Sequence, residues 1–475
     1  MKKPLSFVAV LFLSVMNCMA LCVFDFGAKG DGKHNDTEAI NAAILKAHEN
    51  GGGVVTFPKG EYLTYSVHLM SNVTIRMESG SVIKAAPVTD STYYDLPEPN
   101  TSTYQDFGHS HWQNSLMWGI GLSNVTIEGD GIIDGTGVLT RGQSIHRNSK
   151  VCVANKALAM KDCNNVTVRG VKFLSCGHFA MLLTGVDNLL IEDVTADTNR
   201  DGFDIDCCKD VVVRRCKVNT QNDDAIVLKC SYALGWAKPT ENVLIEDCEV
   251  SGYDIGTLMD GTYGTKVTIV PDQDGPTGRI KLGTESNGGF YNITIRNCKF
   301  THCRGLAIET VDGAAIKNVN VSNITMRDIC NSPIYIRLGD RMRGPDTLPC
   351  SSIDGICISN VKVVDADCRY GCLILGLKDQ PICNVTLRDI DIQYRGGLTK
   401  EDYRKQIGAN HFFLKHDNKY PEPSAHGIQA AWGMTIEYAK NIKLENVKMN
   451  VSLPDERKQF AIKHVSKLKK LRDRK

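Results

Sequence analysis

Short stretches of alternating apolar and polar residues recur along the chain, and each opens with Asn or Asp. Three successive stretches begin at Asn165, Asn188 and Asp210, so their starts are 23 and 22 residues apart. The apolar positions are rich in Val, Ile and Leu, and a period of two is typical of short strands. The stretches that this pattern predicts as strands begin at Asn72, Asn124, Asn165, Asn188, Asp210, Asn242, Asn292, Asn318, Asn384 and Asn441.

A repeat of this length without helices between the strands is typical of a β-solenoid. One coil cannot bury its own apolar face, but coils stacked about 4.8 Å apart bury a continuous apolar column. A sandwich of antiparallel hairpins would need two-residue turns such as Asn-Gly, which are scarce here. We therefore expect an all-β, single-stranded right-handed parallel β-helix that forms one domain over residues 21–460.

Both ends of a solenoid need a cover. Residues 35–48 bring four apolar side chains to one helical face, which predicts an N-terminal capping helix. Asn35 and Glu38 fit a capping box at the start of this helix. Residues 461–475 are basic, and we expect them to form a solvated or frayed tail rather than a membrane or polyanion contact.

The first twenty residues resemble a signal peptide. Lys2 and Lys3 precede an apolar run that ends in small residues at Cys18 and Ala20, and this run is too short to span a membrane. A buried strand and a lipid anchor at Cys18 or Cys22 are the alternatives. We expect an exported protein, periplasmic or extracellular, without membrane insertion.

Composition narrows the partners and the redox chemistry. The 55 Lys and Arg residues balance 54 Asp and Glu residues, which argues against a nucleic-acid-binding protein. Among the eighteen cysteines, Cys216, Cys248 and Cys298 recur in nearly identical strand contexts. This repetition favours small buried thiols stacked in the core over disulfides. No paired Cys-x-x-Cys motif suggests a zinc site.

Three acidic residues mark two neighbouring coils. Asp201 and Asp223 are 22 residues apart, which is one coil, so Asp201, Asp223 and Asp224 should meet on one surface patch. Asp223 and Asp224 can both reach this patch only from a bend, because neighbours in a strand face opposite ways. Repulsion among the carboxylates would raise one pKa and leave others ionised, as glycoside hydrolysis requires. Coil turns and a calcium site are the alternatives.

These residues also resemble the motifs of glycoside hydrolase family 28, which contains the pectin-degrading polygalacturonases and rhamnogalacturonan hydrolases. The family pattern runs Asn-Thr-Asp, Asp-Asp, Gly-His-Gly, Arg-Ile-Lys, and residues 199–202 and 221–224 match its first two parts. Further matches lie at residues 26–32, 124–135 and 283–289, so the resemblance covers most of the chain. It implies a pectin-lyase-like β-helix that hydrolyses pectic polysaccharide or oligosaccharide with inversion, without a metal or an organic cofactor. We expect a monomer.

The resemblance also implies roles for single residues. Asp223 would be the general acid, while Asp201 and Asp224 would hold and activate the attacking water. Asn199 and Lys229 belong to the same motifs and would help to bind substrate. Inversion requires acid and base carboxyls about 6.5–9.5 Å apart, which leaves room for this water.

Two family motifs are missing. The Gly-His-Gly position falls on residues 277–279, which contain no histidine, and the Arg-Ile-Lys position falls on residues 307–309. Ala307 and Glu309 replace the cations that clasp a galacturonate carboxylate in the family. Either the sugar bound there is neutral, such as rhamnose, or cations from another coil take over. The candidate cations, whose alternative is a solvated loop, are Arg337, Arg341 and Arg343.

Each of the other notable residues near these coils has two possible roles. Arg279-Ile280-Lys281 carries the family's letters out of order, and we interpret it as a coincidence of strand composition, with charges that face the cleft as the alternative. His178 lies one coil before Asp201, where it either lines the cleft or, as we favour, is structural. Aromatic residues that either stack on sugar or pack locally are Tyr232, Trp236 and Tyr335.

Three function classes fit the sequence, namely a glycoside hydrolase, a polysaccharide lyase and a non-catalytic glycan-binding β-helix. The hydrolase is favoured because all three aspartates are present, whereas lyases of this shape use calcium and an Arg or Lys base. Residues 90–112, 254–276 and 396–424 lack the strand pattern, so we expect them to wall the cleft and to favour exo action.

Overall fold

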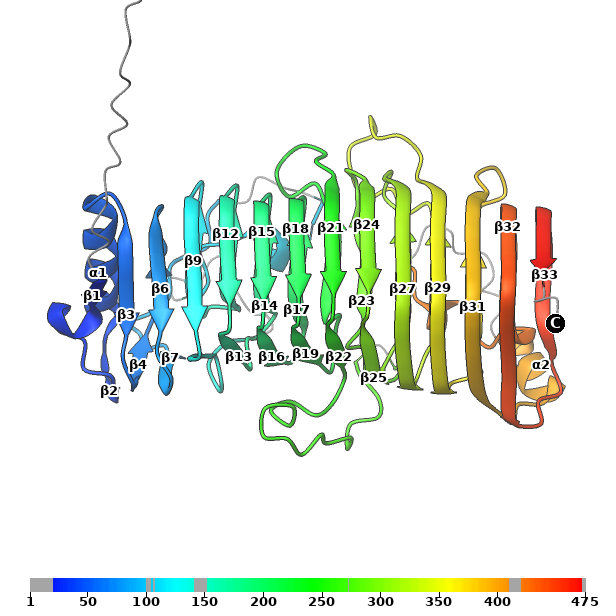
Figure 1. Ribbon diagram of the computed structural model, residues 1–475, viewed down its shortest axis with the longest axis horizontal. Helices are drawn as coiled ribbons and strands as arrows, with labels where there is room; N and C mark the ends of the chain where they lie inside the picture. The colour runs from blue at the N-terminus through cyan, green and yellow to red at the C-terminus, as the bar shows by residue number, and fades with distance from the viewer. Residues whose placement is uncertain are drawn as a thin grey trace, which may run out of the picture.

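The computed structural model describes residues 20–99, 104–105, 107–140, 152–271, 273–409 and 420–471, which wind into one long β-helix (Figure 1). Each coil pairs in parallel with the coils before and after it, as where Phe203 pairs with Ile226 and Ile226 with Ile280. The predicted all-β parallel β-helix is therefore confirmed. Residues 1–19, which hold nearly all of the predicted signal peptide, lie outside the described residues.

The strands form three stacks along the axis. The first stack contains β5 (Val67–His68), β8 (Met117–Ile120), β11 (Lys156–Lys161), β14 (Phe179–Thr184), β17 (Asp201–Asp206), β20 (Ile226–Cys230), β23 (Ile280–Ser286), β26 (Leu306–Thr310), β28 (Ile334–Leu338) and β30 (Cys372–Leu375). The second stack contains β1 (Ala20–Cys22), β3 (Gly53–Phe57), β6 (Val73–Met77), β9 (Ser123–Gly129), β12 (Asn164–Arg169), β15 (Asp187–Glu192), β18 (Lys209–Arg214), β21 (Thr240–Glu246), β24 (Phe290–Arg296), β27 (Ala315–Ile329), β29 (Ser352–Ala366), β31 (Ile382–Gly396), β32 (Ala431–Leu453) and β33 (Lys458–Leu471). The third stack contains β2 (Asp31–Asn35), β4 (Gly60–Thr64), β7 (Ser81–Ala85), β10 (Ile132–Asp134), β13 (Lys172–Leu174), β16 (Thr195–Thr198), β19 (Lys217–Thr220), β22 (Glu249–Ser251) and β25 (Lys299–Cys303). Because β27 also pairs with β25 and β32 with β30, the long later strands continue from one stack into the next.

The polar residue that opens each predicted strand sets a bend in the backbone. All ten of these residues are left-handed, with φ between 52° and 64°, a conformation that Asn and Asp tolerate better than most residues. Their side chains also bond from coil to coil. Asn292 Nδ2 donates to Asn242 Oδ1 at 3.0 Å, and Asn318 Nδ2 donates to Asn292 Oδ1 at 2.8 Å. These residues therefore hold both the corner and the register of each coil.

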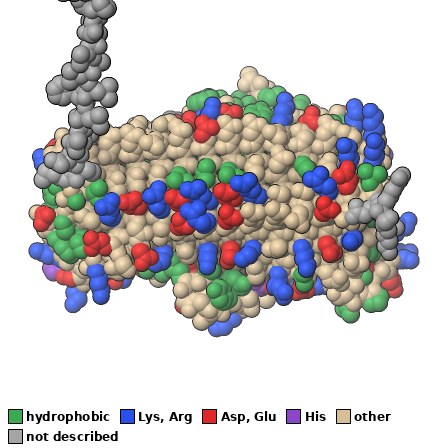
Figure 2. Space-filling model, viewed as in Figure 1, with side chains coloured by type: hydrophobic (Ala, Val, Ile, Leu, Met, Phe, Trp, Pro, Cys, Tyr) green, Lys and Arg blue, Asp and Glu red, His purple; other side chains and the backbone are tan. Residues whose placement is uncertain are grey.

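A band of alternating charges crosses the outer face of the second stack (Figure 2). Equivalent positions on successive coils alternate in sign, so that Arg76 pairs with Glu128 at 2.9 Å and Arg169 pairs with Glu192 at 2.6 Å. These side chains are largely exposed on the cationic side, so each pair adds little stability by itself. The alternation opposes slippage by one coil, because such a slip would place like charges together.

The interior of the coils is an apolar column. Val, Ile and Leu side chains from the three stacks fill it, and Cys216, Cys248 and Cys298 are buried among them. All seventeen cysteines of the described residues are free thiols, so the predicted stack of buried thiols is confirmed.

The two ends of the solenoid differ from expectation in detail. The capping helix is present as α1 (Thr37–Glu49), but its N-cap is Asp36, whose side chain makes no capping hydrogen bond, so the predicted capping box of Asn35 and Glu38 is wrong. Asn35 instead accepts a hydrogen bond from the Thr37 N–H at 3.1 Å. Residues 461–471, which we expected to fray, belong to β33, because their backbone pairs in parallel with β32.

The remaining helical pieces lie outside the coils. They are η1 (Val23–Phe26), η2 (Phe107–Ser110), α2 (Lys400–Ala409) and η3 (Pro423–His426). In the described part of the chain, neither α-helix has the length and apolarity needed to cross a membrane.

Replacement of Asn292 tests the role of the left-handed corner. Asn292→Ala removes two inter-coil bonds and places alanine in a left-handed conformation, which should lower the free energy of unfolding by about 1–3 kcal/mol. Asn292→Gly should cost less, because glycine adopts this conformation freely. Chemical denaturation followed by circular dichroism measures both losses, and equal losses would contradict the backbone argument.

Candidate active site

Three aspartates from two coils meet on the first stack, as the spacing predicts. Asp201 begins β17, and Asp223 and Asp224 lie in the bend before β20, the next strand of the stack. One carboxylate oxygen of each lies within 4.8 Å of an oxygen of the other two. Asp201 and Asp224 are buried, whereas the Asp223 side chain is 20% exposed. The nearest oxygens are thus closer than the 6.5–9.5 Å carboxyl spacing that we expected.

The pKa values of Asp201 and Asp223 are shifted in opposite directions. Burial raises the pKa of Asp201 well above its usual value, and the nearby charge of Asp223 adds to this effect. Burial acts in the same direction on Asp223, but Arg200 outweighs it and lowers the pKa of Asp223. The Arg200 guanidinium pairs with the Asp223 carboxylate, with Nε 3.0 Å from Oδ2. The protonated form is therefore favoured at Asp201, and not at the residue that the family resemblance makes the acid.

Arg279 and Lys281 hold Asp224 from the next coil. Arg279 Nε donates to Asp224 Oδ1 at 2.8 Å, and Lys281 Nζ lies 3.5 Å from Asp224 Oδ2. Glu422, which precedes η3, pairs with the other end of the Arg279 guanidinium. The interpretation of Arg279-Ile280-Lys281 as a coincidence is therefore wrong, because strand alternation turns both charges toward the aspartates.

Glu309 lies behind these cations. Its side chain is fully buried, with Oε2 3.5 Å from Lys281 Nζ. Burial raises the pKa of Glu309 to about 7, although Lys281 and Arg279 oppose the shift. The Arg-Ile-Lys position of the family therefore holds an acid that compensates Lys281, and not a cation open to substrate.

The three candidate replacement cations are turned toward other groups. Arg337, which is paired in register with Glu309, donates to the Leu375 carbonyl at 3.4 Å. Arg341 is bound by Asp312 at 2.8 Å, and Arg343 lies 3.5 Å from Glu285. The Arg341 side chain is only 10% exposed, so this segment is not a solvated loop at that point.

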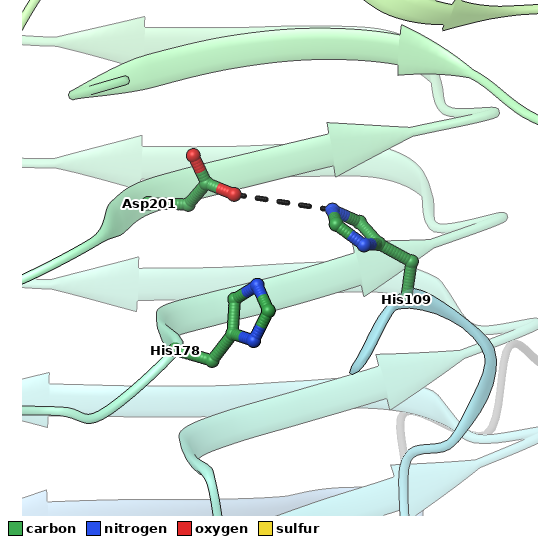
Figure 3. Close-up of side chains that lie close together, drawn as sticks. All are labelled: His109, His178 and Asp201. Atoms are coloured by element: carbon green, nitrogen blue, oxygen red, sulfur yellow. Dashed lines mark ion pairs between the residues drawn. The ribbon is translucent and has the colours of Figure 1, made fainter. Parts of the chain in front are cut away.

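A histidine that the sequence analysis missed stands beside Asp201. His109 comes from η2, and its Nε2 accepts a hydrogen bond from Lys229 Nζ at 2.5 Å and lies 3.9 Å from Asp201 Oδ2 (Figure 3). Lys229 also pairs with Asp204 at 2.7 Å. Burial lowers the pKa of Lys229, but the charges of Asp204, Asp201 and Glu285 outweigh this effect and raise it. A charged Lys229 ammonium can only donate, so Nε2 of His109 is the acceptor in their contact. No motif pointed to His109, because its position beside Asp201 depends on how residues 107–112 fold back.

His178 is a structural residue in this arrangement. Its ring stacks on Phe179 with centroids 4.2 Å apart and meets His109 edge-on. Burial lowers the pKa of His178 well below 6.5, which keeps the ring neutral.

Two sets of side chains have the spacing of metal ligands. They are Asp201 with Asp223 and Asp224, and Asp201 with His109 and His178 (Figure 3). Both sets already face cations, since Arg200 pairs with Asp223 and the Lys229 ammonium contacts His109. A divalent ion would have to displace these groups, so the local charge favours chemistry by side chains alone over the calcium alternative.

The three segments predicted as walls do wall the cleft. The cleft has a volume of about 210 Å³, and the wall segments contribute His109, Pro271, Tyr420 and Glu422 to its lining. The Tyr420 hydroxyl lies 3.2 Å from Lys281 Nζ, which makes this ring the aromatic contact of the cleft in the described part of the chain.

Several residues that we predicted to contact substrate do not line the cleft. Asn199 accepts a hydrogen bond from the Asn222 amide, and it is Asn222 that lines the cleft. Tyr232 packs edge-on against Tyr104, and the Tyr335 hydroxyl bonds His426 at 2.8 Å, so both rings pack locally. The other predicted residues that do not line the cleft are Trp236, His178, Arg279, Glu309 and Arg337.

Comparison with known proteins agrees with this fold. Residues 21–254 match the family model described as "Rhamnogalacturonase A/epimerase, pectate lyase-like". The chain is 24% identical over 389 residues to a probable polygalacturonase of Vitis vinifera, covering 74% of this chain and 76% of that protein. It is 32% identical over 299 residues to plasmin and fibronectin-binding protein A of Streptococcus pneumoniae, covering 59% of this chain but 37% of that protein.

The fold is also shared with a solved structure. An exopolygalacturonase from Thermotoga maritima superposes with a TM-score of 0.62 over 91% of this chain and 92% of that chain, at 19% identity. The predicted resemblance is therefore confirmed. The chain is similar in sequence to polygalacturonases and shares their right-handed parallel β-helix.

Removal of the Glu422 charge tests the buried network. Burial opposes its ionisation, but Arg279, Arg304 and Lys281 lower the pKa of Glu422 to about 2. Glu422→Gln removes a buried counter-charge that these three cations share and should lower the free energy of unfolding by about 3–5 kcal/mol at pH 6. Chemical denaturation measures this loss, with the exposed Glu249→Gln as control, which should change little.

The difference in the free energy of unfolding between wild type and Glu422→Gln should depend on pH. The folded-state pKa of Glu422 lies below its unfolded value of about 4.3, so its stabilisation is complete above that value and is lost as the pH falls toward 2. The difference between wild type and Glu422→Gln should therefore shrink between pH 6 and pH 3. A constant difference would contradict the charge argument.

Proposed function

We propose that the protein is an exported glycoside hydrolase that cleaves pectic saccharides with its three aspartates. The observation that carries this proposal is the convergence of Asp201, Asp223 and Asp224 on the floor of a walled cleft. Carboxyls in different ionisation states are what acid/base hydrolysis of a glycosidic bond requires. The similarity to a probable polygalacturonase over most of both chains supports a pectic substrate.

In the proposed mechanism Asp223 is the general acid. It is the most exposed of the three aspartates, so the leaving oxygen of a bound sugar can reach it. Asp224, which pairs with Arg279 and Lys281, accepts a proton from the water that attacks the anomeric carbon. Asp201, whose pKa is raised by burial, positions this water. The leaving oxygen takes the electron pair of the broken bond together with the proton of Asp223.

The cleft walls favour release of sugars from a chain end. His109, Pro271, Tyr420 and Glu422 come from these walls and line the cleft, which at about 210 Å³ is small for a groove that holds several sugars. We therefore propose exo action by a monomer. Product analysis on homogalacturonan and rhamnogalacturonan oligosaccharides should show single sugars or short units from the first time point, and a ladder of intermediate lengths would contradict exo action.

Asparagine variants test the acid. Asp223→Asn should lower turnover of pectic oligosaccharides by about 10²–10⁴-fold, because the leaving oxygen no longer receives a proton. The loss should be much smaller on a dinitrophenyl glycoside, whose leaving group needs no proton. Asp224→Asn should lose activity on both substrates, and Asp210→Asn on the outer face is the control. Full activity of Asp223→Asn on every pectic substrate would refute the assignment.

The stereochemical outcome is a second test. We propose inversion, which rests on the family resemblance and not on carboxyl spacing, since the nearest oxygens lie within 4.8 Å. Proton NMR during hydrolysis should show a first-formed product whose anomeric configuration is opposite to that of the substrate. A product with the configuration of the substrate would instead indicate a covalent intermediate on one aspartate.

A non-catalytic binding β-helix is the second candidate function. It is favoured by the 32% identity to a streptococcal protein whose name describes binding to plasmin and fibronectin. Glycan binding without release of reducing ends across a pectin panel would support it. Products that absorb in the ultraviolet through a conjugated double bond would instead indicate a lyase.

Export is proposed from the N-terminal sequence. Cleavage after Ala20 would leave a mature chain that begins at Leu21. Sequencing of the N-terminus of the protein made by its own host measures this directly, and an intact Met1 would overturn it.

A further inference from the structure

Most cations in and directly behind the cleft each contact several acids. Arg279 contacts Asp224 and Glu422, and its side chain is 1% exposed. Lys281 lies within 4.0 Å of Asp224, Glu309 and Glu422, and it is equally buried. These charges are already compensated, so a substrate carboxylate would have to compete with two or three fixed partners.

Lys229 is compensated in the same way. It lies within 4.0 Å of Asp201, Asp204 and Glu285 and is 7% exposed. It too is a poor receptor for an incoming anion.

Arg200 is different from these cations. Within the described part of the chain, Asp223 is the carboxylate that it pairs with, and its side chain is 14% exposed in the cleft lining. It stands in Asn199-Arg200-Asp201, where the family motif reads Asn-Thr-Asp. The cation is therefore added in the same chain that has Ala307 and Glu309 in place of the family's Arg and Lys.

We propose that Arg200 binds the carboxylate of a uronate sugar, and that this binding frees Asp223 to take up the proton it donates. The proposal rests on the proposed hydrolase function and deepens it, because it names the substrate class. Arg200 now donates from Nε and from an amino nitrogen to one oxygen, Oδ2, of Asp223. A uronate carboxylate can accept these donors instead, and it can do so through both of its oxygens in two parallel hydrogen bonds.

When a uronate draws Arg200 away from Asp223, the charges that act on the Asp223 carboxyl change. The other titratable or charged groups that face Asp223 come from the neighbouring coils and the 420 segment, and they are His178, Asp201, Asp224, Lys229, Lys281 and Tyr420. Lys229 and Lys281 remain tied to other acids, so the neighbouring carboxylate of Asp224 then favours transfer of the proton from Asp201 to Asp223. A neutral sugar leaves Arg200 on Asp223, and the acid stays ionised.

The consequence is selectivity for the free acid. A galacturonide with a free carboxylate should allow Asp223, the general acid that cleaves it, to become protonated. The methyl ester of the same galacturonide carries no charge and should not have this effect. The residues that bind the sugar ring are the same for both, so the pair of substrates isolates the carboxylate contact.

The experiment compares Arg200→Gln with wild type on an aryl galacturonide and its methyl ester. Wild type should prefer the free acid by at least 10-fold in kcat/KM, and Arg200→Gln should lose most of this preference. Arg200→Lys keeps the charge without the paired hydrogen bonds, so it should retain part of the preference. Arg215→Gln, an exposed arginine on the outer face, is the matched control and should behave as wild type.

A pH profile separates this role from a structural one. Loss of the Arg200 charge raises the pKa of Asp223 in the free enzyme, so the alkaline limb of kcat/KM should move to higher pH in Arg200→Gln. An unmoved limb, or an unchanged preference for the free acid, would overturn the proposal. Circular dichroism and the melting temperature establish that the variants are folded.

Binding distinguishes failure of this proposal from failure of the hydrolase proposal. Calorimetry with galacturonate and its methyl ester measures the same preference without turnover. If wild type hydrolyses no glycoside, the hydrolase proposal fails, and the calorimetric preference still decides the role of Arg200. If hydrolysis occurs but Arg200→Gln keeps the preference in both measurements, the Arg200 proposal alone is wrong.

Discussion

The parallel register between successive coils is the constraint on which this protein depends. Each strand of the first stack is hydrogen-bonded to its equivalents on the two neighbouring coils, so residues one repeat apart are held side by side. A shift by one residue would turn every apolar side chain out of the column. The left-handed asparagines and the alternating surface charges oppose such a shift at two separate points of the coil. The convergence of Asp201 and Asp223 is a direct consequence of this register.

Charge compensation is the second constraint, and it shapes the cleft. Buried carboxylates and cations are stable only when each finds a partner, and the first stack satisfies this with a network rather than with isolated pairs. Arg279 joins Asp224 to Glu422, and Lys281 joins Asp224 to Glu309. The loss of the family's cations at positions 307 and 309 is therefore not a simple loss of positive charge. The neighbouring coil supplies cations, and Glu309 helps to neutralise them.

The coils build the floor of the cleft, while long connections complete it. His109 and Tyr420 come from segments that lack the strand pattern and that cross the first stack from opposite ends of the sequence. These side chains differ from the floor residues in that no repeat holds them in place. Variation of such loops on a constant solenoid can change the sugar that is accepted without disturbing the aspartates.

The sequence by itself determined the elements that follow from periodicity. Alternation of apolar residues, the repeat of 22 or 23 residues and the spacing of Asp201 and Asp223 were sufficient for the β-helix and for the aspartate cluster. The reason is that stacking in a solenoid converts a fixed separation in sequence into contact in space. The helix at the N-terminus and the buried thiols followed from local pattern in the same way.

The charged and aromatic neighbours of the three aspartates became visible only in the folded structure. The pairing of Arg200 with Asp223, the turn of Arg279 and Lys281 toward Asp224, and the arrival of His109 depend on side-chain direction and on loops that carry no repeat. Residues 461–471 also form a final strand, because their backbone pairs with β32, although their composition suggested a solvated tail. Long-range contacts of this kind have no signature in local sequence, because their partners lie many coils or a whole loop away.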